Sequence, residues 1–271
     1  MSESLDMRRL MSLINRQWIS FGKIYIMSLG IAAGVIAAFY GYAVKEFFYN
    51  LSAEPGFIND LLSFRPILFI FLGLLFVTII AGTYFSDLGQ KPKAIFEILI
   101  PASRLEKFIT ALFFSLVVTI GSYIVMYIVI DVGFVLYFRN LAESISDSSS
   151  AVGHGVIDSK IPYLSMKDFP PQLPYFYFLP CLLSAIFLLG SIAFQNFQYI
   201  KTAISVIIYI AVWTISLVYL MKLITRDTMS VTDNGFWNDD LAIFRLILGI
   251  GIFLTVFLWV IGFFRLKEKE V

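Results

Sequence analysis

The sequence predicts an all-α polytopic membrane protein, organised as a single transmembrane domain over residues 1–271 with six transmembrane helices. Six apolar runs of helical length recur along the chain, 59% of its residues are hydrophobic, and its mean hydropathy is +0.85. Soluble domains are only about half apolar. Crossing roughly 30 Å of hydrocarbon takes about 20 apolar residues, whose backbone groups must be satisfied within a helix or a closed barrel. We therefore expect spans at residues 24–44, 66–86, 108–130, 175–194, 202–221 and 246–264.

The segment before the first span has an amphipathic helical pattern. Apolar residues recur at helical spacing, and the side opposite carries arginines; the apolar set is Met7, Leu10, Met11, Ile14, Trp18 and Phe21. Such a pattern is typical of a helix that lies in the headgroup layer, with its arginines over anionic lipid. We expect an N-terminal interfacial amphipathic helix here, and a simple membrane anchor is the alternative interpretation.

The first span contains small residues one helical turn apart, at Gly30, Gly34 and Ala38. Small residues at this spacing allow two helices to approach closely in a membrane. The contact is either packing within one subunit or a dimer face, and the pattern favours neither.

Residues 87–107, between the second and third spans, predict a short cytoplasmic helix. Ile95, Leu99 and neighbouring residues form an apolar stripe, and Pro101 ends it. Ser103 and Glu106 then have the S-x-x-E spacing of a capping box, so the third span should begin near Arg104 with its own N-cap. An ordinary loop that happens to be amphipathic is the alternative. Further along, the short connection at residues 195–201 predicts that the fourth and fifth spans form an antiparallel hairpin.

The basic residues are distributed unevenly across the predicted topology. With the N-terminus inside, the inner side holds Arg8, Arg9, Arg16, Lys23, Lys91, Lys93, Arg104, Lys107, Lys201, Arg265, Lys267 and Lys269. That leaves eight of the 20 Lys and Arg residues outside. Basic residues near span ends favour the cytoplasmic face, so both termini should be cytoplasmic in a multi-pass protein of the plasma (inner) membrane.

The sequence contains few residues that could form a catalytic or ion-binding site. The central parts of the predicted spans carry no ionisable residue, and Asp131, Lys45 and Arg245 lie near outer span ends, where we expect them to reach water or the interface. A single histidine, a single cysteine and the lack of any hydrolase, metalloprotease or phosphate-loop motif argue against an enzyme. We expect no cofactor, no metal and no nucleic-acid partner, and any ATP must be bound by another chain.

Two stretches carry a resemblance to a known family. Residues 91–113, KPKAIFEILIPASRLEKFITALF, resemble the L-P-A-S-x-x-E-K-F segment between the second and third spans of small ABC-2 type permease subunits, as found in Bacteroidetes-like genomes. Residues 190–202 resemble a second feature of this group, G-S-x-x-F-x-K-N-x-x-x-K-T, with a departure at the first Lys of that pattern. The largest outer segment also departs from better-known members, because here it follows the third span and not the fifth.

The resemblance implies a function and a set of site residues. It implies a permease subunit of an ATP-driven transporter that works with a separate ABC ATPase subunit, as a homo- or heterodimer in the lipid bilayer. The segment at residues 93–99 would be the coupling helix that docks into the ATPase. The coupling residues would be Lys93, Ile95, Phe96, Leu99, Pro101, Ser103, Glu106 and Lys107. The alternative is a transport-inactive scaffold or signalling protein that uses the same cytoplasmic surface.

Overall fold

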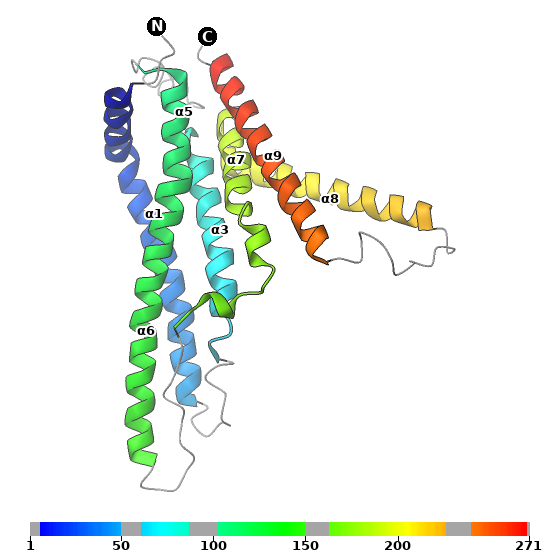
Figure 1. The fold of residues 1–271 in the computed structure, drawn as a ribbon. Helices are drawn as coiled ribbons and strands as arrows, with labels where there is room; N and C mark the ends of the chain where they lie inside the picture. Colours follow the sequence, from blue (N-terminus) through cyan, green and yellow to red (C-terminus); the bar gives the residue numbers. More distant parts are fainter. Residues whose placement is uncertain (1–5, 50–60, 87–101, 150–162, 226–239, 270–271) are drawn as a thin grey trace. The chain divides into compact units, whose positions relative to one another are not determined.

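The computed structural model describes residues 6–49, 61–86, 102–149, 163–225 and 240–269, and these residues contain helices and no strand (Figure 1). The α-helices are α1 (Met7–Tyr49), α3 (Arg65–Tyr84), α5 (Arg104–Leu112), α6 (Thr119–Ser149), α7 (Leu179–Ala193), α8 (Gln198–Thr225) and α9 (Asp240–Lys269). A π-helical stretch, η2 (Phe113–Val118), joins α5 to α6. The short 3₁₀ helices η3 (Met166–Asp168) and η4 (Leu173–Phe176) precede α7.

Six helical stretches of the described residues are long and apolar enough to cross a membrane. They are Met7–Tyr49, Arg65–Tyr84, Arg104–Leu141, Leu173–Ala193, Gln198–Leu220 and Leu241–Glu268. Each one contains or overlaps a span expected from the sequence. The chain is therefore an all-α, multi-pass membrane protein, and the predicted fold class is confirmed.

The first helix is longer than the expected first span. α1 runs without interruption from Met7 to Tyr49, so one helix includes both the predicted interfacial segment and the span at residues 24–44. No proline interrupts this stretch, and a proline is the usual cause of a helix break. The helix bounds therefore do not separate the two parts that the amphipathic pattern distinguishes.

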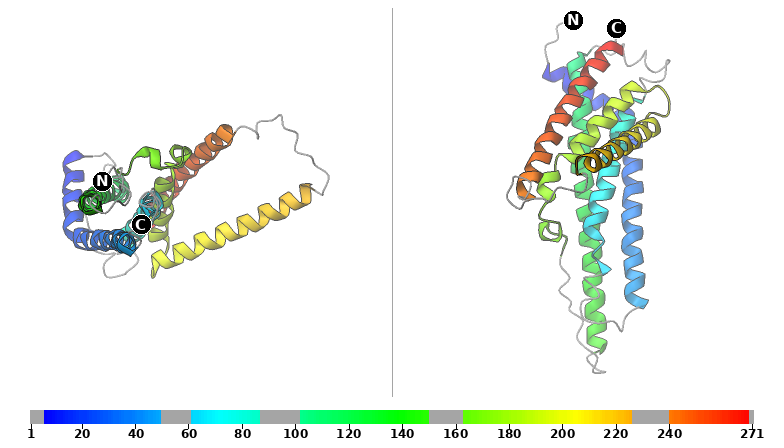
Figure 2. Two further views of the ribbon diagram at one scale, coloured as in Figure 1. Left: turned by 90° about the horizontal axis from the view of Figure 1, so that it is seen from below. Right: turned by 90° about the vertical axis from the view of Figure 1, so that its right-hand side faces the viewer.

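The described helices fall into two compact units, and one of them is built from Arg16–Phe76 and Val117–Pro171. In it, α1, the first part of α3 and α6 lie side by side (Figures 1 and 2). Aromatic residues fill the space between them. Tyr123 of α6 lies over Gly73 of α3, where a Cβ would come within 2.7 Å of the ring, and Tyr25 of α1 packs on Phe76 with 5.9 Å between ring centroids.

The other unit comprises Met1–Asn15, Val77–Leu116 and Gln172–Val271. In it, α7 and α5 pack against different parts of α9. Phe178, just before α7, covers Gly251 so closely that any side chain there would overlap its ring. Phe108 of α5 packs edge-on against Phe263 of α9, with ring centroids 5.8 Å apart. A glycine of α9 thus admits a large ring from the α7 side, whereas the contact with α5 pairs two large rings.

The connection between α7 and α8 differs from the predicted antiparallel hairpin. Beyond the turn, α8 diverges from α7 and does not run back along it (Figures 1 and 2). The two helices touch beside the turn, where a side chain on Gly190 would overlap Thr202. Phe197 in the turn has a left-handed backbone, with φ of 52°, and this changes the direction of the chain within a few residues. No residue in the most apolar window of α8 is buried.

Candidate functional site

The N-terminus of α5 carries the capping box that the sequence predicts. The Glu106 backbone N–H donates to Ser103 Oγ at 3.2 Å, and the Ser103 backbone N–H donates to Glu106 Oε2 at 2.8 Å. α5 accordingly begins at Arg104, as expected. These two bonds satisfy backbone donors that a helix start otherwise leaves without partners.

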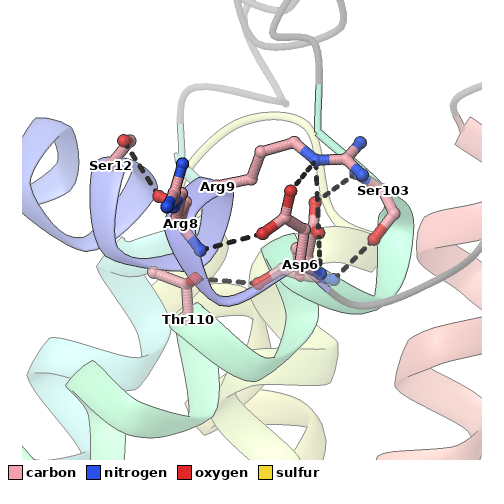
Figure 3. Close-up of polar contacts among 7 residues, drawn as sticks. Asp6, Arg8, Arg9, Ser12, Ser103 and Thr110 are labelled. Atoms are coloured by element: carbon pink, nitrogen blue, oxygen red, sulfur yellow. Dashed lines mark hydrogen bonds and ion pairs between the residues drawn. The ribbon is translucent and has the colours of Figure 1, made fainter.

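The Glu106 carboxylate does more than close its own cap. Its other oxygen, Oε1, accepts the backbone N–H of Asp6 at 2.9 Å and lies 4.0 Å from Nε of Arg9 (Figure 3). The Glu106 side chain is fully buried. A buried carboxylate is costly unless charge-assisted hydrogen bonds compensate for the lost water. Two backbone donors, a nearby guanidinium and the N-terminal end of the α5 dipole supply that compensation.

Asp6 is in turn the residue that starts α1. Its carboxylate accepts the backbone N–H of Arg8 at 3.0 Å, which is the bond expected of a helix N-cap, and pairs with Nε of Arg9 at 3.4 Å. Its own backbone N–H is the group that binds Glu106. The first turn of α1 and the first turn of α5 are therefore joined through one buried carboxylate. We call Asp6, Arg9, Ser103 and Glu106 the Glu106 clamp.

The Glu106 clamp is suited to holding the first turns of two helices together. Both carboxylate oxygens are engaged by backbone N–H groups, and the Glu106 carbonyl accepts the Thr110 hydroxyl at 2.8 Å. In the part of the chain that the structure describes, no group of three or more His, Cys, Asp and Glu residues could hold a metal ion.

The other predicted site residues have different outcomes. Lys107 follows Glu106 on α5 and is half-buried. Lys93, Ile95, Phe96, Leu99 and Pro101 lie outside the described residues. Gly30, Gly34 and Ala38 lie on exposed positions of α1, and a Cβ at either glycine would meet nothing within 4 Å. The open space at both glycines gives no support to close packing within one subunit.

A second buried polar cluster, which the sequence did not predict, lies in the unit formed by α1, α3 and α6. Asp131 is only 3% exposed, and its Oδ1 lies 3.3 Å from Nη1 of Arg65, itself 5% exposed. The Tyr40 hydroxyl donates to the same oxygen. Tyr127 donates its hydroxyl to the Arg65 carbonyl at 2.9 Å.

The expectation that Asp131 reaches water at a span end is therefore wrong, because side chains of three helices surround its carboxylate. Lys45 and Arg245, by contrast, are exposed. The sequence does contain a signal for the Arg65–Asp131 pair. Arg65 stands at the start of the second apolar run, and Tyr127 lies one helical turn before Asp131.

Comparison of the chain with protein-family models, with curated proteins and with solved structures gave no match.

Proposed function

We propose that this chain is the membrane-spanning permease subunit of an ATP-driven transporter of the ABC-2 type, coupled to a separate ATP-binding subunit. Six apolar helices and the resemblance carried by residues 91–113 and 190–202 support the proposal. The observation on which it chiefly depends is the Glu106 clamp, which fixes the helix that follows the proposed coupling segment.

The clamp suggests how a push on residues 93–99 would reach the membrane helices. The push would enter α5 through its capped first turn, two residues after Pro101. Because Glu106 also holds the backbone of Asp6, the first turn of α1 would move together with α5. Hydrogen bonds to a buried charged acceptor contribute about 1.5–3 kcal/mol each, so the joint is stiff compared with a surface loop. A pathway between subunits would then alternate its access as the ATPase closes and opens.

The proposal includes an orientation and an oligomeric state. Both termini and the Glu106 clamp would be cytoplasmic, in a plasma (inner) membrane. Two subunits would pair, and the open face of α1 at Gly30 and Gly34 supports pairing through that helix. Without dependence on ATP hydrolysis, the same chain would instead be a scaffold or signalling protein.

The test is a variant in the proposed coupling segment. Truncating a buried interface anchor costs about 2 kcal/mol or more, a roughly thirtyfold loss of affinity. We expect Phe96→Ala to release an ATPase that otherwise co-purifies with the tagged full chain, and to leave the melting temperature nearly unchanged. The measurements are ATP hydrolysis in the eluate and a thermal melt of the same sample.

The matched control is Leu105→Ala, which truncates a partly exposed apolar residue in the first turn of α5. It should retain the ATPase. Full retention of the ATPase by Phe96→Ala, with a large fall in melting temperature, would show that Phe96 packs inside the chain and would overturn the coupling assignment. An eluate of the unmodified chain that never hydrolyses ATP would favour the scaffold.

A further inference from the structure

A short segment closes over the buried ion pair of α3 and α6. Residues 163–169, which we call the strap, are attached at three points within their unit. The Arg139 guanidinium lies 4.3 Å from the ring centre of Tyr163 and donates to its hydroxyl at 3.1 Å. The Leu164 backbone N–H donates to Oδ2 of Asp131 at 3.2 Å, and Phe169 packs edge-on against Phe69.

The Asp131 carboxylate divides its two oxygens between the helices and the strap. Oδ1 accepts from Tyr40 of α1 and Arg65 of α3, whereas Oδ2 accepts from Leu164 of the strap. The bonds to Oδ1 do not require the bond to Oδ2. The strap can therefore leave while the ion pair and the three helices stay together.

Much of the strap is exposed, and the strap keeps its own shape. Tyr163 is 39% exposed, and Ser165, Lys167 and Asp168 are exposed. Ser165 and Asp168 form a capping box of their own, with the Ser165 N–H donating to Asp168 Oδ2 at 2.7 Å. Segments that bury little apolar surface open locally at a small fraction of the cost of global unfolding. This segment is a preformed unit held by polar contacts at Tyr163 and Leu164 and by one ring contact at Phe169.

We propose that the strap is a latch over the Arg65–Asp131 pair: it opens by releasing the Leu164 N–H from Asp131 while α1, α3 and α6 remain packed, and it thereby admits water to the buried carboxylate. A buried ion pair contributes little stability beyond what apolar residues of the same volume would give. An ionisable pair within membrane helices is by default a functional feature. The latch does not depend on the function proposed above.

Hydrogen exchange of the full chain, read by mass spectrometry, tests the latch. In the unmodified protein we expect strap amides to exchange at least roughly tenfold faster than the amides of residues 123–135 in α6. Strap amides that exchange only as slowly as those of α6 would mean that the strap opens with the whole unit, and this would overturn the proposal.

Asp131→Asn tests the bond itself. Tyr40 and Arg65 both direct donors at one oxygen position, so the amide oxygen should occupy it and the amide NH₂ should face the Leu164 N–H. Losing a hydrogen bond to a charged acceptor should speed strap exchange roughly tenfold or more, with α6 exchange unchanged. An unchanged strap rate, or equal acceleration of strap and α6, would contradict the latch.

Tyr40→Phe is the matched control, because it removes a bond to Oδ1 and leaves Oδ2 untouched. It should not change strap exchange relative to α6, and preferential acceleration of the strap would contradict the division between the two oxygens.

Should Asp131→Asn not fold, Tyr163→Ala removes the Arg139 contact from the exposed side. It should accelerate the strap and leave α6 unchanged, and the opposite result would again overturn the proposal.

Discussion

Glu106 and Asp131 are both buried carboxylates, but they are satisfied in different ways. Glu106 depends on two backbone N–H donors, one from its own cap and one from the start of α1. Asp131 depends on a guanidinium, a tyrosine hydroxyl and the backbone N–H of Leu164. Replacing Glu106 by its amide therefore leaves one backbone donor unpaired, and a buried donor without a partner is costly.

Glu106→Gln should lower the stability of the full chain by about 1–3 kcal/mol. The side chain keeps its shape, but its NH₂ group must face either the Asp6 N–H or the Ser103 N–H, and the attraction to Arg9 is lost. A thermal melt in detergent measures the effect. The control is Glu268→Gln, whose side chain is 62% exposed in its pair with Arg265 and should change stability by less than about 1 kcal/mol. Equal shifts of the melting temperature in the two variants would mean that the Glu106 clamp contributes no more stability than an exposed ion pair.

At the scale of the helix, the glycines separate into two kinds. Gly190 and Gly251 lie directly under Thr202 and Phe178, so they let elements of one subunit approach closely. Gly30 and Gly34 of α1 have open space where a side chain would be. Glycine costs helix stability without a packing partner. The open pair on α1 is therefore available to a second subunit.

Gly34→Leu should weaken self-association while leaving folding intact. A Cβ at this position meets nothing within 4 Å, but a leucine would hold two closely packed helix backbones apart. The dimer fraction in detergent and the melting temperature measure the two effects. Gly121→Leu on α6 is the control, because that glycine is also open, and it should leave the dimer fraction unchanged. An unaltered dimer in Gly34→Leu would exclude this face of α1 as the contact.

At the scale of the whole molecule, six apolar helices establish a multi-pass membrane protein. The distribution of Lys and Arg predicts its orientation across the membrane. The predicted inner ends carry Arg8, Arg104 and Lys267, and the long connection after α6 is predicted to lie outside. An even number of spans predicts that both termini lie on the same side.

Topology is tested with single cysteines after Cys181→Ser. Lys267→Cys, near the end of α9, and Ser144→Cys, near the end of α6, stand at exposed positions on opposite sides of the predicted membrane. An impermeant thiol reagent added to intact cells should label Ser144→Cys and spare Lys267→Cys, with both labelled after the cells are opened. The reverse pattern in intact cells would invert the orientation and place the Glu106 clamp outside.

Features that depend on neighbouring residues followed from the sequence alone, and features that depend on distant pairs did not. Hydropathy summed over about 20 residues predicts a span, and Ser103 and Glu106 are close enough in sequence for their cap to be predicted from spacing. Asp6 binds Glu106 from 100 positions away, and Arg65 pairs with Asp131 across 66. No local pattern specifies such partners, because any of several charged residues near the span ends would satisfy it. Only the packing of α1, α3 and α6 decides that Asp131 is buried and that Lys45 is not, since burial depends on which helices surround a residue.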